Sequence, residues 1–75
     1  MEDIKTNKQG AIDYFVDCIA TICEGYKAKE LDVDGVEFED LSTMIKQLQE
    51  LEDGTHVTIF ECPMSASGLN FRVES

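Results

Sequence analysis

The spacing of the apolar residues changes at Gly54, and this change is the feature that most restricts the folds open to the chain. Before Gly54 the apolar residues recur every three to four residues, as on one face of an α-helix, and after it they alternate, as in a half-buried β-strand. Amphipathic helices and a one-sided sheet both need a partner to cover their apolar surface. With 75 residues the chain is near the lower size limit for a single hydrophobic core. We therefore expect one small domain that contains both kinds of element.

Two helices are predicted in the first part of the chain. The first runs from Lys8 to about Tyr26, with Gly25 in its closing turn. The second begins near Leu41, with Asp40 or Ser42 as its N-cap, and is expected to end at Gly54. Its stripe of apolar residues spans barely two heptads, which favours packing within the domain over a coiled coil.

Two strands are predicted after Gly54. The segments HVTIFEC (56–62) and LNFRVES (69–75) are rich in β-branched and aromatic residues, and the small polar segment PMSASG (63–68) joins them. Together they predict a C-terminal hairpin. Phe60 points to the face opposite Ile59, so either that face is also covered or Phe60 is available for contact.

The segment ELDVDGVEFED, residues 30–40, has several interpretations: a calcium loop, a tight turn between two strands, a negative surface for a partner, or a plain solvated loop. With Gly35 at loop position 6, oxygen ligands fall at positions 1, 3 and 5 of an EF-hand calcium loop, but Leu41 falls where the bidentate glutamate belongs. This partial match disfavours specific calcium binding. An Asp-Gly pair flanked by alternating residues is instead the strongest short-range hairpin signal. We expect a hairpin with Asp34 and Gly35 in its turn.

These elements predict an α+β fold in which two helices pack on one face of a small antiparallel sheet, in the order α-β-β-α-β-β. Residues 1–7 are expected to form a flexible N-terminal arm, and residues 8–75 the domain. The expected core consists of Phe15, Ile19, Ile22, Met44, Ile45, Leu48, Val57, Ile59, Phe71 and Val73.

Charge is the most unusual feature of the composition. Sixteen acidic residues against six basic ones give a net charge of −10. Nine of the acids, but only one base (Lys46), lie between Glu30 and Asp53. Such a field repels nucleic acids and anionic membranes and attracts basic surfaces. Direct binding of nucleic acid and binding to a membrane are therefore not expected.

The side chains needed for catalysis or for a metal site are few. His56 is the only histidine and opens a strand directly after a turn, some six residues from Cys62. Cys18 and Cys23 diverge by about 140° around a helix, which argues against a zinc site with His56 and Cys62. The odd number of cysteines is typical of reduced thiols. We expect no enzymatic activity, no metal and no cofactor.

The charge pattern favours a protein-binding module that presents carboxylates to a basic groove of a larger, nucleic-acid-handling protein. In size and charge the chain is similar to phage-encoded inhibitors of the DNA-mimic and anti-CRISPR types, an analogy of class without a shared motif. No apolar signal segment opens the sequence, so a cytoplasmic location, in a host cell for a phage protein, is expected. The predicted partner-binding residues are Asp32, Asp34, Glu37, Glu39, Asp40, Glu50, Glu52 and Asp53.

A second hypothesis comes from the apolar residues that the core does not need. Phe60, Met64 and Tyr14 would then form a contact surface of a small structural or accessory subunit, which docks on a partner or forms a homodimer. Salt separates the two hypotheses, because it weakens binding through carboxylates steeply and apolar docking little.

Overall fold

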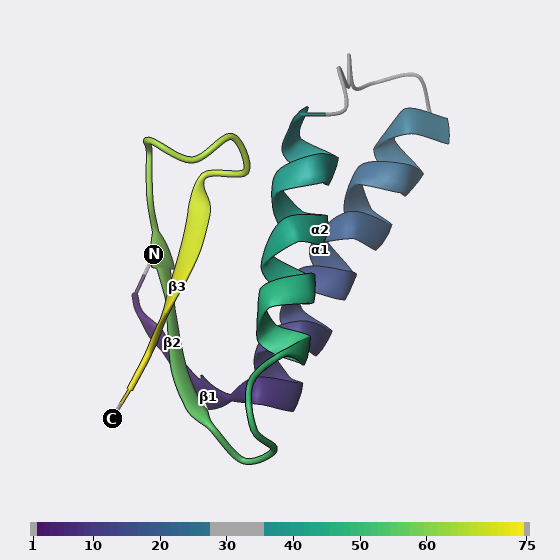
Figure 1. The fold of residues 1–75 in the computed structure, drawn as a ribbon. Helices are drawn as coiled ribbons and strands as arrows, with labels where there is room; N and C mark the ends of the chain where they lie inside the picture. The colour runs from purple at the N-terminus through teal and green to yellow at the C-terminus, as the bar shows by residue number, and fades with distance from the viewer. Residues whose placement is uncertain (1, 28–35, 75) are drawn as a thin grey trace.

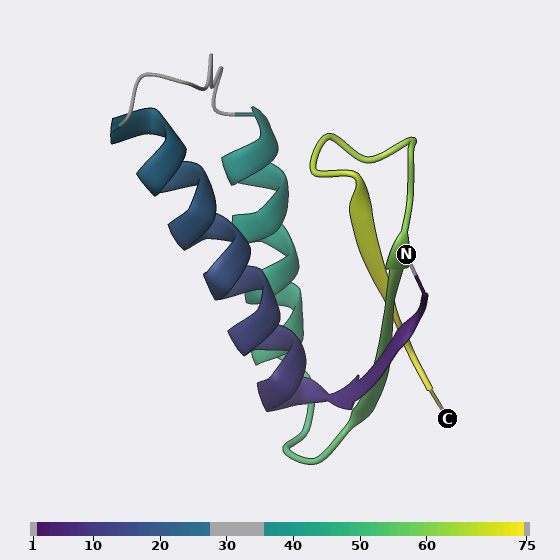
Figure 2. The same cartoon turned by 180° about the vertical axis from the view of Figure 1, so that it is seen from behind.

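The computed structural model describes residues 2–27 and 36–74 of the chain, with five elements in these ranges. They are strand β1 (Ile4–Asn7), helix α1 (Lys8–Lys27), helix α2 (Val36–Gln49), strand β2 (His56–Glu61) and strand β3 (Leu69–Val73). The strands form an antiparallel sheet in the order β1-β2-β3, and both helices lie on the same side of it (Figure 1 and Figure 2). The predicted α+β class is confirmed, but the order of elements is β-α-α-β-β.

The N-terminal segment corrects the first part of that prediction. Residues 1–7 were expected to form an arm outside the domain, yet residues 4–7 form an edge strand that pairs with β2. Ile4 lies opposite Ile59 and Thr6 opposite Val57, so both face the helices. Four residues are too short a segment for the alternation of apolar residues to be recognised in the sequence.

Strand β1 continues into helix α1 without a loop. The side-chain Oδ1 of Asn7 accepts a hydrogen bond from the backbone N–H of Gly10 at 2.9 Å and so caps the helix. The backbone N–H of Lys8 still donates to the carbonyl of Thr55, at 2.8 Å, and extends the ladder between β1 and β2 by one residue. The strand and the helix are thus fixed relative to one another at a single junction.

The hairpin predicted over residues 30–40 is wrong in its second half. Helix α2 begins at Val36, so the residues expected in the second strand form the first turn of a helix. Leu31, Val33, Asp34 and Gly35 lie outside the described residues, as does the calcium loop that would use them. Alternation over residues 36–39 competes with helical spacing, because Phe38 precedes Leu41 by three residues and Ile45 by seven. Acidic residues at the start of the helix also suit its dipole.

The predicted ends of the second helix are also corrected. Asp40 and Ser42 lie within α2 and do not cap it, since the helix extends back to Val36. At the other end the helix stops at Gln49, five residues before Gly54. Gly54 instead adopts a φ of 82° in the connection to β2, a backbone conformation that favours glycine.

The core forms where the two helices meet the central strand. Its buried apolar residues are Ala11, Phe15, Leu41, Met44, Leu48, Val57 and Ile59. Of the other expected core residues, Ile19, Ile45 and Phe71 are partly buried against this cluster, whereas the side chain of Ile22 lies outside the described set. The prediction of Val73 as a core residue is wrong, because this residue ends an edge strand and is 50% exposed.

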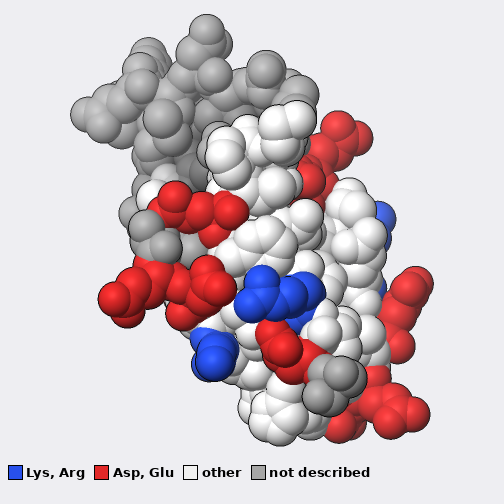
Figure 3. Space-filling model, turned by 90° about the vertical axis from the view of Figure 1, so that its left-hand side faces the viewer, with Lys and Arg blue, Asp and Glu red and all other residues white. Residues whose placement is uncertain are grey.

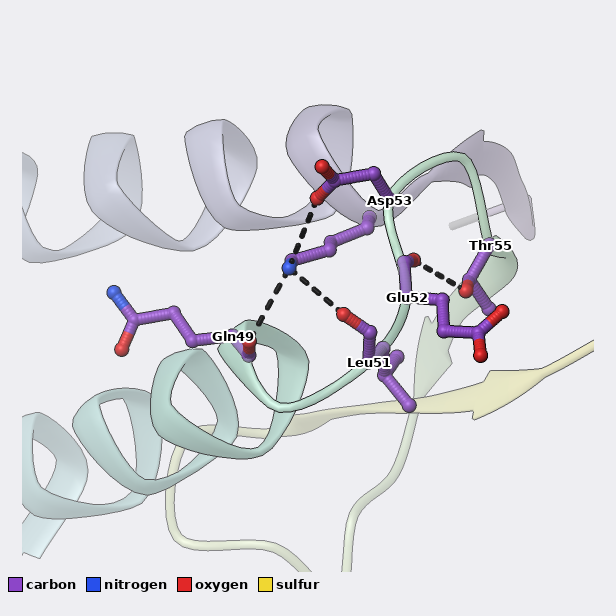
Figure 4. Close-up of polar contacts among 6 residues, drawn as sticks. Gln49, Leu51, Glu52, Asp53 and Thr55 are labelled. Atoms are coloured by element: carbon purple, nitrogen blue, oxygen red, sulfur yellow. Dashed lines mark hydrogen bonds and ion pairs between the residues drawn. The ribbon is translucent and has the colours of Figure 1, made fainter.

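Lys8 fastens the start of α1 to the end of α2. Its Nζ donates to the carbonyl oxygens of Gln49 (3.2 Å) and Leu51 (2.8 Å) and forms an ion pair with Asp53 (3.3 Å) (Figure 4). The Lys8 side chain is only 16% exposed. A helix leaves its last four carbonyl groups without helical partners, and a cation at that end also suits the helix dipole. Lys8 therefore stabilises the C-terminus of α2 from another element.

Replacing Gly10 by alanine should destabilise the fold. A Cβ at this position would stand 2.1 Å from Oγ1 of Thr6, so either the Thr6 side chain or the strand and helix would have to shift. We expect Gly10→Ala to lower the free energy of unfolding by about 1–3 kcal/mol in urea titrations. In a Thr6→Ala background the same change should be neutral or stabilising, because alanine is the better helix former. An equal loss in both backgrounds would contradict the contact.

Lys8→Met should destabilise the protein by removing the donor to two carbonyl groups. Methionine keeps most of the aliphatic bulk, so the expected loss of about 1–3 kcal/mol in the free energy of unfolding reports the polar contacts. Lys46→Met, at an exposed position near the end of α2, is the matched control and should change little. Equal effects of the two substitutions would show that Lys8 acts only through its charge.

Candidate protein-binding surfaces

The eight predicted partner-binding carboxylates do not form one cluster among the described residues. Asp32 and Asp34 lie outside the described residues, and Glu37 is in α2 but its side chain is not described. Glu39 and Asp40 lie in the first turns of α2, whereas Glu50 follows its last residue. Glu50 lies ten positions after Asp40 and just past the end of the helix, which is about 15 Å along the axis.

Among the described side chains, two of the predicted carboxylates have contacts within the fold. The carboxylate of Asp40 accepts hydrogen bonds from the backbone N–H of Ser67, at 3.2 Å, and from the hydroxyl of Ser67. This contact fastens α2 to the connection between β2 and β3. Asp53 pairs with Lys8 but is itself fully exposed, so it remains accessible to a partner. The hydrogen bonds of Asp40 to Ser67 indicate that its carboxylate stabilises the fold.

The helices carry a second set of carboxylates that the sequence analysis did not assign to the site. Asp13 and Asp17 are exposed on α1, four residues apart, so their Cα atoms are about 6 Å apart along the helix. They lie on the side of α1 opposite the buried Phe15. The signal was present in the sequence, since residues two positions on either side of a buried helical residue point about 160° away from it.

The outward sides of both helices are therefore acidic. Of the described side chains there, Asp13, Asp17, Glu39 and Glu50 are exposed and form none of the ion pairs that join described residues. Asp13 accepts a hydrogen bond from the amide of Gln9, which leaves its charge uncompensated. We call Asp13, Asp17, Glu39 and Glu50 the helical carboxylates, although Glu50 lies directly after the last residue of α2. Lys46 is the one basic side chain described on α2, so the local field on this layer is negative.

The outer face of the sheet, away from the helices, differs in charge. Lys5, Thr58 and Arg72 lie in one row across the three strands. Arg72 forms ion pairs with Asp3 (3.5 Å) and Glu74 (3.0 Å). Figure 3, seen from the side of the sheet, shows basic groups in the middle of this face with acidic groups around them. Acids and bases compensate one another here, which they do not do on the helices.

A small polar network closes part of this outer face. The Oε1 atom of Glu74 accepts a hydrogen bond from the hydroxyl of Thr58 at 2.6 Å, and the guanidinium of Arg72 lies 5.4 Å from the ring centre of Phe60. Thr58 is fully buried by these contacts although no helix covers it. The sequence left open whether the sheet face that carries Phe60 is covered. Arg72 covers this face in part.

The three residues of the apolar hypothesis lie on three different parts of the molecule. Phe60 is half-buried in the outer sheet face, and Tyr14 is half-buried on α1, with its ring edge-on to Phe15. Met64 is 93% exposed in the connection between β2 and β3. The three side chains belong to separate surfaces, so a partner would have to reach each of them from a different element.

Groups that could carry redox or metal chemistry are dispersed. Among the described side chains, no three of the histidine, cysteine, aspartate and glutamate residues lie close enough to hold a metal ion. Cys18 and Cys62 are half-buried and not joined in a disulfide. A hydrogen bond from the side chain of Ser65 is the main cause that lowers the pKa of the Cys62 thiol. Neither described helix is long and apolar enough to cross a membrane.

No protein-family model, curated protein or solved structure is similar to this chain at a significant level. The fold and the surfaces define a small α+β protein with an acidic helical layer and a charge-compensated sheet.

Glu74 should give the protein a measurable dependence of stability on pH. Its pKa lies below the ordinary 4.5, first because of the Thr58 hydroxyl and then because of Arg72. A carboxyl group whose pKa is lowered by folding stabilises the folded state above its unfolded pKa, and this contribution disappears as the pH falls through the folded pKa. The free energy of unfolding of Glu74→Gln should therefore fall less than that of the unchanged protein below about pH 4.5. Urea titrations at several pH values measure this, and parallel pH profiles would contradict it.

Proposed function

We propose that the protein is a non-enzymatic module that binds a basic surface of a larger protein through carboxylates on its helices. The partner is a nucleic-acid-handling protein whose Lys and Arg side chains would otherwise contact phosphates. The module acts as an inhibitor by competition, in the manner of phage-encoded DNA mimics, in the cytoplasm of a host cell. This proposal keeps the predicted residues Glu39, Glu50, Glu52 and Asp53 and adds Asp13 and Asp17.

The separation of charge between the two sides of the molecule supports the proposal. On the sheet face, Arg72 compensates Asp3 and Glu74 at short distance. On the helices, Asp13, Asp17, Glu39 and Glu50 are exposed without such a partner among the described residues. Carboxylates near one another repel, and a domain of this size has little stability to lose. An uncompensated layer on a rigid helix pair is an arrangement that a basic partner would stabilise.

The proposed mechanism is electrostatic competition. Helices hold their carboxylates at fixed spacing, so binding to a basic groove costs little ordering of the inhibitor. Phosphate-binding grooves are rich in Lys and Arg and bind anions with a strong dependence on salt. The module would enter such a groove in place of nucleic acid and leave no room for it.

The apolar hypothesis is kept as the second candidate function because Met64, Val16 and Phe38 are exposed. A structural subunit that docks through such residues would bind with little dependence on salt. Met64→Ala would then weaken binding more than any charge change.

The test is capture of partners on the immobilised protein, with elution in steps of increasing salt and identification by mass spectrometry. We expect a nucleic-acid-handling protein to elute at moderate salt. The variant Asp13→Asn/Asp17→Asn should retain this partner at least tenfold less well, because each lost carboxylate removes one contact with a Lys or Arg side chain of the partner. A partner retained at high salt, and equally by this variant, would contradict the proposal.

A matched control separates the helical carboxylates from net charge. The variant Glu2→Gln/Glu61→Gln also removes two negative charges, one before β1 and one at the end of β2. It should bind the partner nearly as well as the unchanged protein. Equal losses in the two variants would show that the total charge, and not the helical layer, attracts the partner. Far-ultraviolet circular dichroism checks that both variants fold.

A further inference from the structure

The two edges of the sheet are not equivalent. Successive residues of an edge strand direct their backbone groups alternately toward the neighbouring strand and toward solvent. The N–H of Glu74 donates to His56 and that of Cys62 to Gly68, so the even-numbered residues of β3 face β2. Leu69, Phe71 and Val73 therefore direct their backbone groups to the open edge.

Side chains of the protein itself occupy much of the β3 edge. The hydroxyl of Ser67 lies 3.3 Å from both the N–H and the carbonyl oxygen of Leu69. The side-chain oxygen of Asn70 accepts the N–H of Phe71 at 2.8 Å. Proteins commonly protect edge strands in such ways, because an open edge is a template for another strand. A partner strand would have to displace these contacts.

The β1 edge is open. The hydrogen bond from Lys8 to Thr55 places the backbone groups of Thr6 and Ile4 toward β2, so those of Asp3, Lys5 and Asn7 point outward. No side chain among the described residues bonds to the backbone of Lys5. Beside it, Lys5, Thr6, Asn7 and His56 line an open depression of about 330 Å³. The chain leaves this edge available.

We propose that two copies of the protein pair through this edge, as antiparallel β1 strands related by a two-fold axis at Ile4. In this register Asp3 of each copy lies opposite Lys5 of the other, and the outward backbone groups of both residues form the hydrogen bonds. The two Ile4 side chains, which face the helices, meet at the axis. The three-stranded sheets join into one continuous sheet.

Charge selects a second copy as the occupant and selects this register. Opposite charges directly across a strand pair stabilise it, whereas like charges destabilise it. Shifting the axis by one residue, to Lys5, would place the two lysines opposite one another. Two-fold symmetry forms the favourable pair twice, as in any isologous interface. Asp3 pairs with Arg72 at 3.5 Å, but its own side chain is 50% exposed, so it remains accessible to Lys5 of the other copy.

This inference is independent of the proposed function, since the helical carboxylates lie on α1, on α2 and directly after α2, away from the β1 edge, and remain exposed in the dimer. The contact is small, and each copy carries a charge of −10, so we expect a weak dimer that forms at high protein concentration. Sedimentation equilibrium at physiological salt, from micromolar to millimolar protein, should show a shift from monomer to dimer. The amide resonances of Asp3 and Lys5 should move with concentration.

Charge reversal provides the decisive test. Lys5→Asp places two pairs of acids across the interface, and Asp3→Lys places two pairs of lysines there, so each variant alone should be at least tenfold weaker in dimerisation. An equimolar mixture of the two should form a heterodimer, because both cross-strand pairs are then opposite in charge. Lys46→Asp, with the same change in net charge on the outward side of α2, should dimerise like the unchanged protein.

The outcomes are separable from loss of folding, since the mixture dimerises only if both variants fold. An unchanged protein that remains monomeric at millimolar concentration would overturn the proposal, and so would dimerisation of Lys5→Asp alone. Failure of the mixture to associate, with both variants folded, would overturn the proposed register.

Discussion

The contacts of Lys8 with the end of α2 connect the parts of this structure that lie far apart in the sequence. Its Nζ contacts the carbonyl groups of Gln49 and Leu51, and its backbone N–H contacts Thr55. The same residue thus begins α1, closes α2 and continues the ladder between β1 and β2. In a chain of 75 residues the core supplies little stability beyond the entropy cost of folding. A well-placed cation at the meeting point of three elements then adds to the apolar core in holding the layers together.

That junction also explains how the molecule presents its two surfaces. Asn7 caps α1 directly after β1. Because Gly10 has no side chain, the helix can approach Thr6 of the strand closely. The helices are thereby held on one side of the sheet, and their acidic sides face solvent. The other side of the sheet is left to a compensated network around Arg72. One surface is suited to a basic partner, and the open β1 edge is suited to a second strand.

The sequence was most informative where periodic segments were long. The stripes around Phe15 and Leu48 predicted both helices, and the alternation around Ile59 predicted the C-terminal hairpin. It was least informative in short segments. The pattern of residues 36–39 is compatible with either a strand or a helix. The helix forms because it lets Leu41 and Leu48 pack in the core. Six of the eight predicted partner-binding residues lie in ranges that the structure describes, and they fall at or near the two ends of α2.

The sequence by itself determined that this protein is small, strongly acidic and α+β, because charge and the period of the apolar residues are local properties of the chain. Only the tertiary structure decided that residues 4–7 are a strand, since β1 gains its stability from β2, which lies some fifty residues later. It also decided that Asp40 bonds Ser67 and that Lys8 closes α2. Each of these depends on which residues meet across the fold, and a local pattern carries no information about distant partners.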